Sequence, residues 1–73
     1  MNTLHKRTVI LRKERGVPVI AARRDRDGCL SFWCQHCEGW HFHGVGDGHR
    51  QANCWRIWSP YEAKGYILIG STR

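Results

Sequence analysis

The chain has 73 residues, a formal net charge of +6 and 41% hydrophobic residues, with four cysteines and five histidines. This length allows one domain over residues 1–73, and so small a core usually needs disulfides or a metal ion for stability. No apolar run approaches the roughly 18 residues of a membrane-spanning helix, and the first residues lack the apolar segment of a signal peptide. We therefore expect a cytoplasmic protein with reduced thiols and no membrane partner.

Positive charge gathers in the first third of the chain. Residues 1–27 hold eight Lys or Arg against three Asp or Glu, whereas the remaining 46 residues hold four against three. Such a field favours a polyanionic partner, although a solvated face that only maintains solubility is the alternative. We expect residues 1–7 to be a flexible basic arm carrying Lys6 and Arg7. The candidate phosphate contacts that follow are Arg12, Lys13, Arg15, Arg23, Arg24 and Arg26.

The first half of the chain predicts short strands joined by tight turns. Apolar, β-rich runs cover residues 8–11 and 17–22. The Asp-Gly pair that follows tolerates the positive φ of a tight turn, so it predicts a hairpin joining 18–24 to 29–33. This hairpin leads directly into a C-x-x-C motif.

The segment from Cys34 to Cys54 holds three of the four cysteines and four of the five histidines. A C-x-x-C pair can bind one side of a tetrahedral ion, and a second pair further along the chain can bind the other side. The sequence therefore predicts one structural zinc ion, bound by Cys34, Cys37 and Cys54.

The fourth ligand is open. His49 is preferred because it precedes Cys54 at close to the usual spacing of a ligand pair and follows a glycine-rich loop that lets the chain return. The alternates are His43, His41 and Cys29. A closed set of four protein ligands makes the site structural, since a catalytic zinc keeps one position for water. His36 is expected to be exposed.

Residues 40–43 alternate aromatic and histidine side chains. In a strand, Trp40 and Phe42 share one face and His41 and His43 the other. We expect the aromatic face to be core and the histidine face to look toward the metal or the solvent. At least two of the four tryptophans should be buried in so small a core.

The segment Ser59-Pro60-Tyr61-Glu62 carries the signals of a helix start, with a serine N-cap, a proline at the first position and a capping glutamate. Gly65 can end the helix in the left-handed conformation. The expected fold is small, metal-stabilised and β-rich (β+α), resembling a zinc ribbon or knuckle. It has short antiparallel strands, one short C-terminal helix near 60–64 and a last strand over 66–69.

Residues 34–66 carry a compound pattern: C-x-x-C, then H-F-H-G, then G-D-G-H-R, a closing cysteine and an S-P-Y…G-Y tail. This pattern resembles small zinc-ribbon-like proteins of bacteriophages and other bacterial mobile elements. That group often has a histidine just before the last cysteine, where this chain has Asn53. The resemblance implies a zinc fold and a phage-like origin, without a settled activity.

Three functions follow from these features. A zinc-stabilised module that binds nucleic acid is the first, with basic residues on phosphates and Trp33, Trp40, Trp55 or Trp58 stacking on bases. The alternative is an adaptor or inhibitor that docks on a host protein. A zinc-dependent hydrolase is the third, with a centre assembled from His41, His43, Asp47 and His49. No small-molecule substrate is evident.

Overall fold

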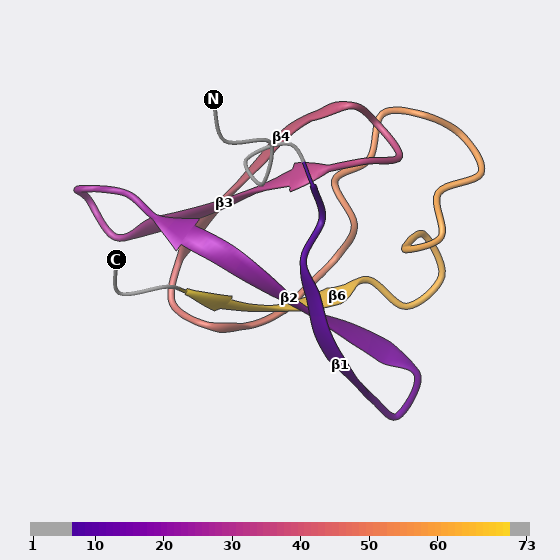
Figure 1. Ribbon diagram of the computed structural model, residues 1–73, viewed down its shortest axis with the longest axis horizontal. Helices are drawn as coiled ribbons and strands as arrows, with labels where there is room; N and C mark the ends of the chain where they lie inside the picture. The colour runs from indigo at the N-terminus through magenta and orange to yellow at the C-terminus, as the bar shows by residue number, and fades with distance from the viewer. Residues whose placement is uncertain (1–6, 71–73) are drawn as a thin grey trace.

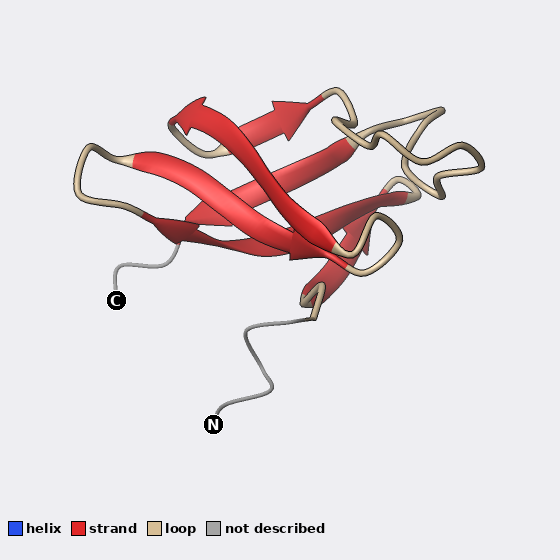
Figure 2. Ribbon diagram, turned by 90° about the horizontal axis from the view of Figure 1, so that it is seen from above, coloured by secondary structure: helices blue, strands red, loops and turns tan. Residues whose placement is uncertain are grey.

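The computed structural model describes residues 7–70, which form six strands and no helix (Figure 1). The strands are β1 (Ile10–Glu14), β2 (Val17–Arg24), β3 (Cys29–Cys34), β4 (Gly39–Val45), β5 (Gly48–Arg50) and β6 (Tyr66–Gly70). They make one sheet in the order β4-β3-β2-β6-β5, and β1 also pairs with β2. The sheet curls into a half-barrel (Figure 2). Residues 1–6 of the expected basic arm lie outside the described residues.

β2 is the strand to which the others are anchored. Its residues 17–20 pair with β1, residues 19–22 pair with β6, and Arg23 and Arg24 pair with β3. The predicted hairpin of β2 and β3 is present, with Gly28 at a φ of 87° in its turn. The β2–β6 pair is parallel, which corrects the expectation of antiparallel strands only. A parallel pair needs a long crossover, and here the crossover contains the whole cysteine- and histidine-rich segment.

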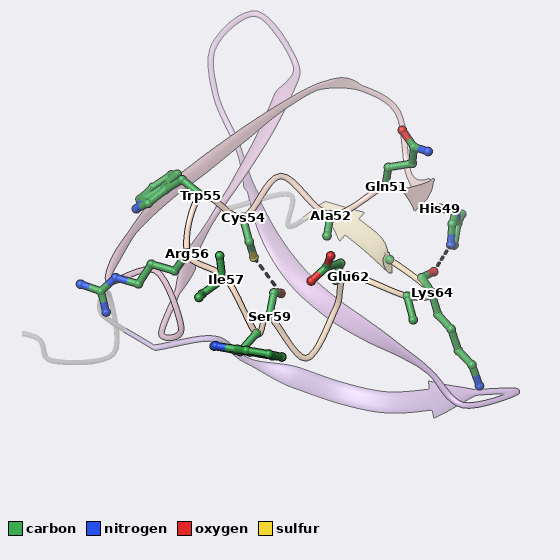
Figure 3. A pocket seen from close by; sticks show the side chains of 13 residues that line it. His49, Gln51, Ala52, Cys54, Trp55, Arg56, Ile57, Ser59, Glu62 and Lys64 are labelled. Carbon is green, nitrogen blue, oxygen red and sulfur yellow. Dashed lines mark hydrogen bonds between the residues drawn. The ribbon is translucent and has the colours of Figure 1, made fainter.

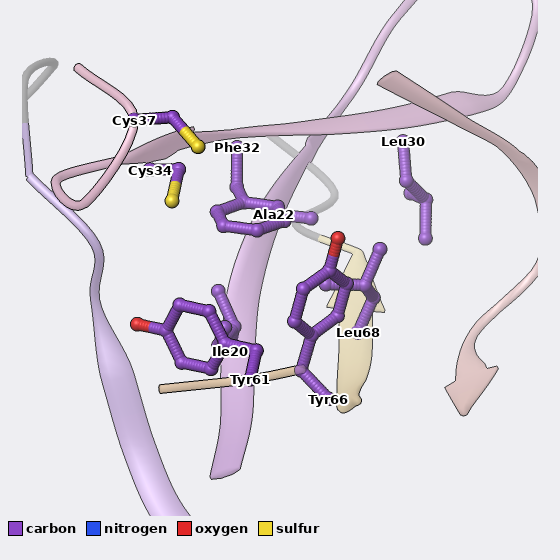
Figure 4. Packing of buried hydrophobic residues seen from close by; sticks show 9 residues of the cluster. All are labelled: Ile20, Ala22, Leu30, Phe32, Cys34, Cys37, Tyr61, Tyr66 and Leu68. Carbon is purple, nitrogen blue, oxygen red and sulfur yellow. The ribbon is translucent and has the colours of Figure 1, made fainter. Parts of the chain in front are cut away.

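The core lies on the inner face of this curled sheet and is closed at one end by two cysteines (Figure 4). Its aromatic members are Phe32, Tyr61 and Tyr66, and Tyr66 packs edge-on against both of the other rings, with centroids 4.9 and 5.5 Å away. The remaining members are Ile20, Ala22, Leu30, Cys34, Cys37 and Leu68.

None of the four tryptophans is buried, so the expectation that two would be is wrong. Trp33 and Trp40 are half-buried, and Trp58 is 83% exposed. Tyrosines take the core positions instead. The Tyr66 hydroxyl meets polar partners inside, accepting a hydrogen bond from the Asn53 N–H at 3.1 Å, as a buried phenol requires.

The aromatic face of β4 is not core, whereas the histidine face directs His41 toward the candidate metal site, as expected. His41 is fully buried, whereas Phe42 is 69% exposed, so the aromatic face is not core. The cause is the register with β3, in which His41 lies opposite Phe32 and Phe42 lies opposite Ser31. Directly paired residues point to the same side of a sheet, and Phe32 points inward.

The predicted helix near 60–64 is absent, and these residues form a turn. The local signals are present: the Ser59 hydroxyl accepts a bond from the Tyr61 N–H at 3.0 Å, and Gly65 has a φ of 72°. Between them one α-helical bond forms, from the Gly65 N–H to the Tyr61 carbonyl at 2.7 Å, beside a bond of the 3₁₀ type from the Glu62 N–H to the Ser59 carbonyl at 3.3 Å. One turn carries the full cost of nucleation without propagation, and Tyr66 must already be extended in β6. In residues 7–70, no helix is long and apolar enough to cross a membrane.

Candidate metal centre

Three sulfurs and one imidazole converge at one end of the core. Cys34 is the last residue of β3, Cys37 lies in the turn that follows, and His41 is in β4. Cys54 arrives from the loop after β5. The four ligand atoms all lie within 4.8 Å of one another. The group can hold a metal ion, and Figure 4 shows two of its sulfurs, those of Cys34 and Cys37, side by side above Tyr61.

Two of the distances within this group match those of a tetrahedral metal site. Metal–sulfur bonds of about 2.3 Å place two sulfurs about 3.8 Å apart, and a metal–nitrogen bond of about 2.0 Å places sulfur and nitrogen about 3.5 Å apart. The Sγ atoms of Cys34 and Cys54 are 3.8 Å apart, and His41 Nε2 lies 3.5 Å from Cys54 Sγ. A disulfide would bring two sulfurs to about 2.05 Å. All four cysteines are free thiols.

His41 is buried without conventional hydrogen bonds. Its Nε2 faces Cys54, and its Nδ1 has no hydrogen-bond partner within residues 7–70. The ring is held instead by edge-on contacts with Phe32 and Trp55, with centroids 5.4 and 4.8 Å away. Burial lowers the pKa of His41, which keeps the ring in the neutral form that binds metal. A metal ion on Nε2 would satisfy one of two otherwise poorly paired nitrogens.

The thiols occupy unequal environments. Burial acts to raise the pKa of the Cys37 thiol, yet the net pKa is lowered because backbone N–H groups of Arg56 and Trp55 donate to its sulfur. Burial raises the pKa of Cys54 to about 12, although the Ser59 hydroxyl donates to that sulfur at 3.1 Å. If these thiols ionised together, a divalent ion held by them would supply the compensating positive charge.

The segment after Cys54 is fixed against the C-x-x-C turn. His36 Nε2 lies 2.9 Å from the Ile57 carbonyl, and the Arg56 guanidinium donates to the His36 carbonyl at 3.2 Å. His36 is half-buried, which corrects the expectation that it is exposed. Gly39 makes room for this segment, because a Cβ there would lie 2.6 Å from the Trp55 ring. Sequence reasoning missed these supports, since they join residues about 20 positions apart.

The other candidate ligands lie elsewhere. His49, the preferred fourth ligand, is in β5, and its Nε2 lies 2.6 Å from the Lys64 carbonyl. His43 Nε2 lies 2.8 Å from the Tyr66 hydroxyl. Cys29 is at the opposite end of β3 from Cys34. The structure therefore brings the alternate His41, and not His49, to the three predicted cysteines.

The residues of the hydrolase alternative do not meet at one point. His41 faces the sulfurs, while His43 and His49 contact different partners, as described above. Asp47 accepts bonds from the Gly70 N–H at 2.8 Å and from Arg24 at 3.2 Å. The Gly70 N–H, with smaller help from Arg24, lowers the pKa of this carboxyl. Asp47 thereby ties the glycine-rich loop to the ends of β2 and β6.

The six basic candidates lie in β1, at the end of β2 and in the turns on either side of β2. Two of the six candidates are ion-paired, Arg12 with Glu14 at 2.8 Å and Arg24 with Asp47 at 3.2 Å. The other four are exposed and have no ion-pair partner among the described residues: Lys13, Arg15, Arg23 and Arg26. The turns that follow β1 and β2 lie at opposite ends of β2 (Figure 1).

An open hollow lies between residues 49–58 and the turn 59–65 (Figure 3). His49 and Lys64 stand at one end, and Trp55 and Arg56 at the other. The Ser59 hydroxyl, which contacts Cys54, lies between these two ends. The hollow thus borders the metal centre on the side of its one half-buried ligand.

Comparisons of this chain with protein-family models, with curated proteins and with solved structures found no match. The resemblance to zinc-ribbon-like phage proteins stays a prediction.

Proposed function

We propose that this protein is a small zinc-stabilised module that binds nucleic acid through its basic surface, encoded by a phage or mobile element. Three thiolates and one imidazole are a ligand set typical of structural zinc sites. Zinc prefers this mixture of sulfur and nitrogen, and a full set of four protein ligands leaves no position for a reacting water. The metal would supply folding energy, and the surface would supply the function.

The observation that carries the proposal is the set of unpaired cations. Lys13, Arg15, Arg23 and Arg26 are exposed along the β1–β2–β3 segment without an acidic partner among the described residues. Several acidic side chains are already engaged with protein groups, which leaves these cations to attract an external polyanion: Glu14, Asp25, Glu38 and Asp47. Phosphate contacts of this kind are sequence-independent and weaken with salt.

The proposal is tested by titrating the zinc-loaded protein against fluorescent DNA and RNA at several salt concentrations. We expect log K to fall linearly with log salt. The variants Arg23→Ala and Arg26→Ala should each reduce the slope by about 0.7 to 0.9. Arg12→Ala removes the same charge, but its guanidinium already pairs with Glu14, so it should change the slope less. An absence of binding at low salt would contradict the proposal.

The second candidate is a protein-docking module, favoured by the loop that follows Cys54. Trp55, Ile57 and Trp58 are 60, 74 and 83% exposed, and the loop is held rigid by the contacts of His36 and Arg56. Tryptophan beside arginine is the composition of an interface anchor. Nuclease-resistant capture of one stoichiometric host protein, abolished by Trp58→Ala, would favour this function. Capture that persists in Trp58→Ala would argue against docking through this loop.

A further inference from the structure

The outer face of β2, β3 and β4 carries side chains that core packing does not explain. Arg23, Ser31 and Phe42 lie opposite one another across the three strands, and Trp33 and Trp40 form the neighbouring row. Phe42 is 69% exposed in the middle of β4, the edge strand that pairs with β3. An aromatic ring that stays exposed on a sheet contributes little burial free energy to the fold. We therefore look for a binding partner that would cover this ring.

This face combines packed aromatic rings with one positive charge. The Trp33 and Trp40 rings pack edge-on, with centroids 5.8 Å apart. The Arg23 guanidinium carbon lies 5.7 Å from the Trp40 ring centroid, within cation–π range. Neither row contains an acidic residue. The strand pairing fixes where the Phe42 ring stands relative to Arg23.

An exposed ring on the same sheet face as an arginine, two strands away, has the chemistry of a base-stacking site. Unpaired bases offer their faces to aromatic rings and guanidinium groups, while the adjacent phosphates pair with cations. In a duplex the base faces are already stacked, and the grooves present only base edges. A ring on an open sheet therefore discriminates single strands from duplexes.

We propose that this outer face is a stacking platform that selects single-stranded nucleic acid. The Phe42 ring receives one base, and Arg23, supported by Trp40, pairs with the neighbouring phosphate. Because the partner is a polyanion, the charge of Arg23, which has no ion-pair partner among the described residues, favours it over an apolar protein surface. This inference rests on the proposed function and names the class of nucleic acid.

The test measures binding of one oligonucleotide, single-stranded and as its duplex, at one salt concentration. Stacking of one base predicts that the single strand binds between about 5-fold and about 150-fold more tightly than the duplex, and that Phe42→Ala removes this preference. Phe42→Leu keeps apolar bulk without a π-face and should lose the preference as well. Phe42→Trp should keep it.

Trp58→Ala is the matched control, since it removes another exposed aromatic ring from a different loop. It should leave the preference for the single strand unchanged. Each variant is checked for zinc content and for the circular dichroism of the folded protein before titration. Quenching of tryptophan fluorescence by the single strand gives a second readout, because Trp33 and Trp40 adjoin the platform.

The possible outcomes separate the two proposals. Equal binding of single strand and duplex overturns the platform, while binding of nucleic acid through the basic surface stands. A Phe42→Leu variant that binds like the unmodified protein shows an apolar contact and also overturns stacking. If Trp58→Ala loses the preference for the single strand and Phe42→Ala keeps it, the platform is overturned and the stacking site lies in the loop that follows Cys54. Failure to bind any nucleic acid overturns both proposals.

Discussion

The two faces of the β3–β4 hairpin follow opposite rules. The inner face buries His41 and Cys34, while the outer face leaves Phe42 and half of Trp40 in solvent. Hydrophobicity alone would bury the aromatic side chains of the outer face and leave His41 in solvent. A structural zinc site contributes about 10–16 kcal/mol of apparent binding free energy, whereas burying one phenylalanine side chain contributes about 1.5–3 kcal/mol. If the four ligands hold zinc, this difference would favour placing them, and not Phe42, on the inner face.

This comparison predicts that changes on the inner face unfold the protein and changes on the outer face alter only binding. The largest effect should come from metal removal. A strong chelator, or the variant Cys34→Ser, should abolish the folded state, because the core alone is marginal at this size. Amide dispersion in a proton–nitrogen NMR spectrum measures it. A spectrum that stays dispersed in excess chelator would show that the core holds without metal.

The next largest effect should come from His41. The change His41→Ala should weaken zinc affinity by at least about 100-fold, since even residues that support a ligand contribute about 10–100-fold. His49→Ala should leave zinc affinity nearly unchanged and remove only the contact to the Lys64 carbonyl. Competition with a chromophoric chelator gives both affinities. The reverse order would restore His49 as the fourth ligand.

Tyr66 should have an intermediate effect on the inner face. Its hydroxyl accepts the Asn53 N–H at 3.1 Å and contacts His43 at 2.8 Å, and burial raises its pKa to about 12. Tyr66→Phe leaves these partners unsatisfied and should cost about 1–3 kcal/mol of unfolding free energy. Urea denaturation of the zinc-loaded protein measures the cost. A change below about 0.5 kcal/mol would mean that water replaces the hydroxyl.

Asp47 should give a smaller, pH-dependent effect. Its pKa is lowered by the Gly70 N–H and by Arg24, so its stabilising contribution is present above the usual carboxyl pKa of 3.8 and is lost as pH falls below it. The stability difference between the protein and Asp47→Asn should therefore be constant near neutral pH and shrink toward zero in acid. Thermal melts of both variants at matched pH measure the difference. A stability difference that grows as the pH falls would contradict a lowered pKa of Asp47.

The smallest effect should come from the outer face. Phe42→Thr should change the unfolding free energy by no more than about 0.5 kcal/mol, as for other exposed positions. A threonine also suits a strand. Urea denaturation of the zinc-loaded protein applies here too. A loss above about 1 kcal/mol would show that the ring serves the fold, which would weaken the contrast between the two faces.

Local patterns in the sequence predicted local structure well. The C-x-x-C spacing and the closing cysteine indicated a metal site, and the structure brings Cys34, Cys37 and Cys54 together. The Asp-Gly pair indicated the β2–β3 turn, and Gly65 does stop a turn in the left-handed conformation. Each of these signals depends on a few neighbouring residues.

Features that depend on pairing between residues far apart in the sequence could not be predicted from the sequence. The choice between His41 and His49 follows from the β3–β4 register, and a shift of one residue would exchange the two faces of β4. The parallel β2–β6 pair joins segments separated by the whole metal-binding crossover. The capping signals at Ser59 correctly indicated a turn at this position, but a single turn is too short to form a stable helix.

The central claim is that one metal ion is bound by Cys34, Cys37, His41 and Cys54. Extended X-ray absorption fine structure of the zinc-loaded protein tests it most directly, because it reports the number and distance of the sulfur ligands and identifies an imidazole by the outer-shell scattering of its ring. We predict three sulfurs at about 2.3 Å and one imidazole nitrogen at about 2.0–2.1 Å, with the imidazole scattering lost in His41→Ala and kept in His49→Ala. Fewer than three sulfurs, or imidazole scattering that survives the loss of His41, would contradict this ligand set.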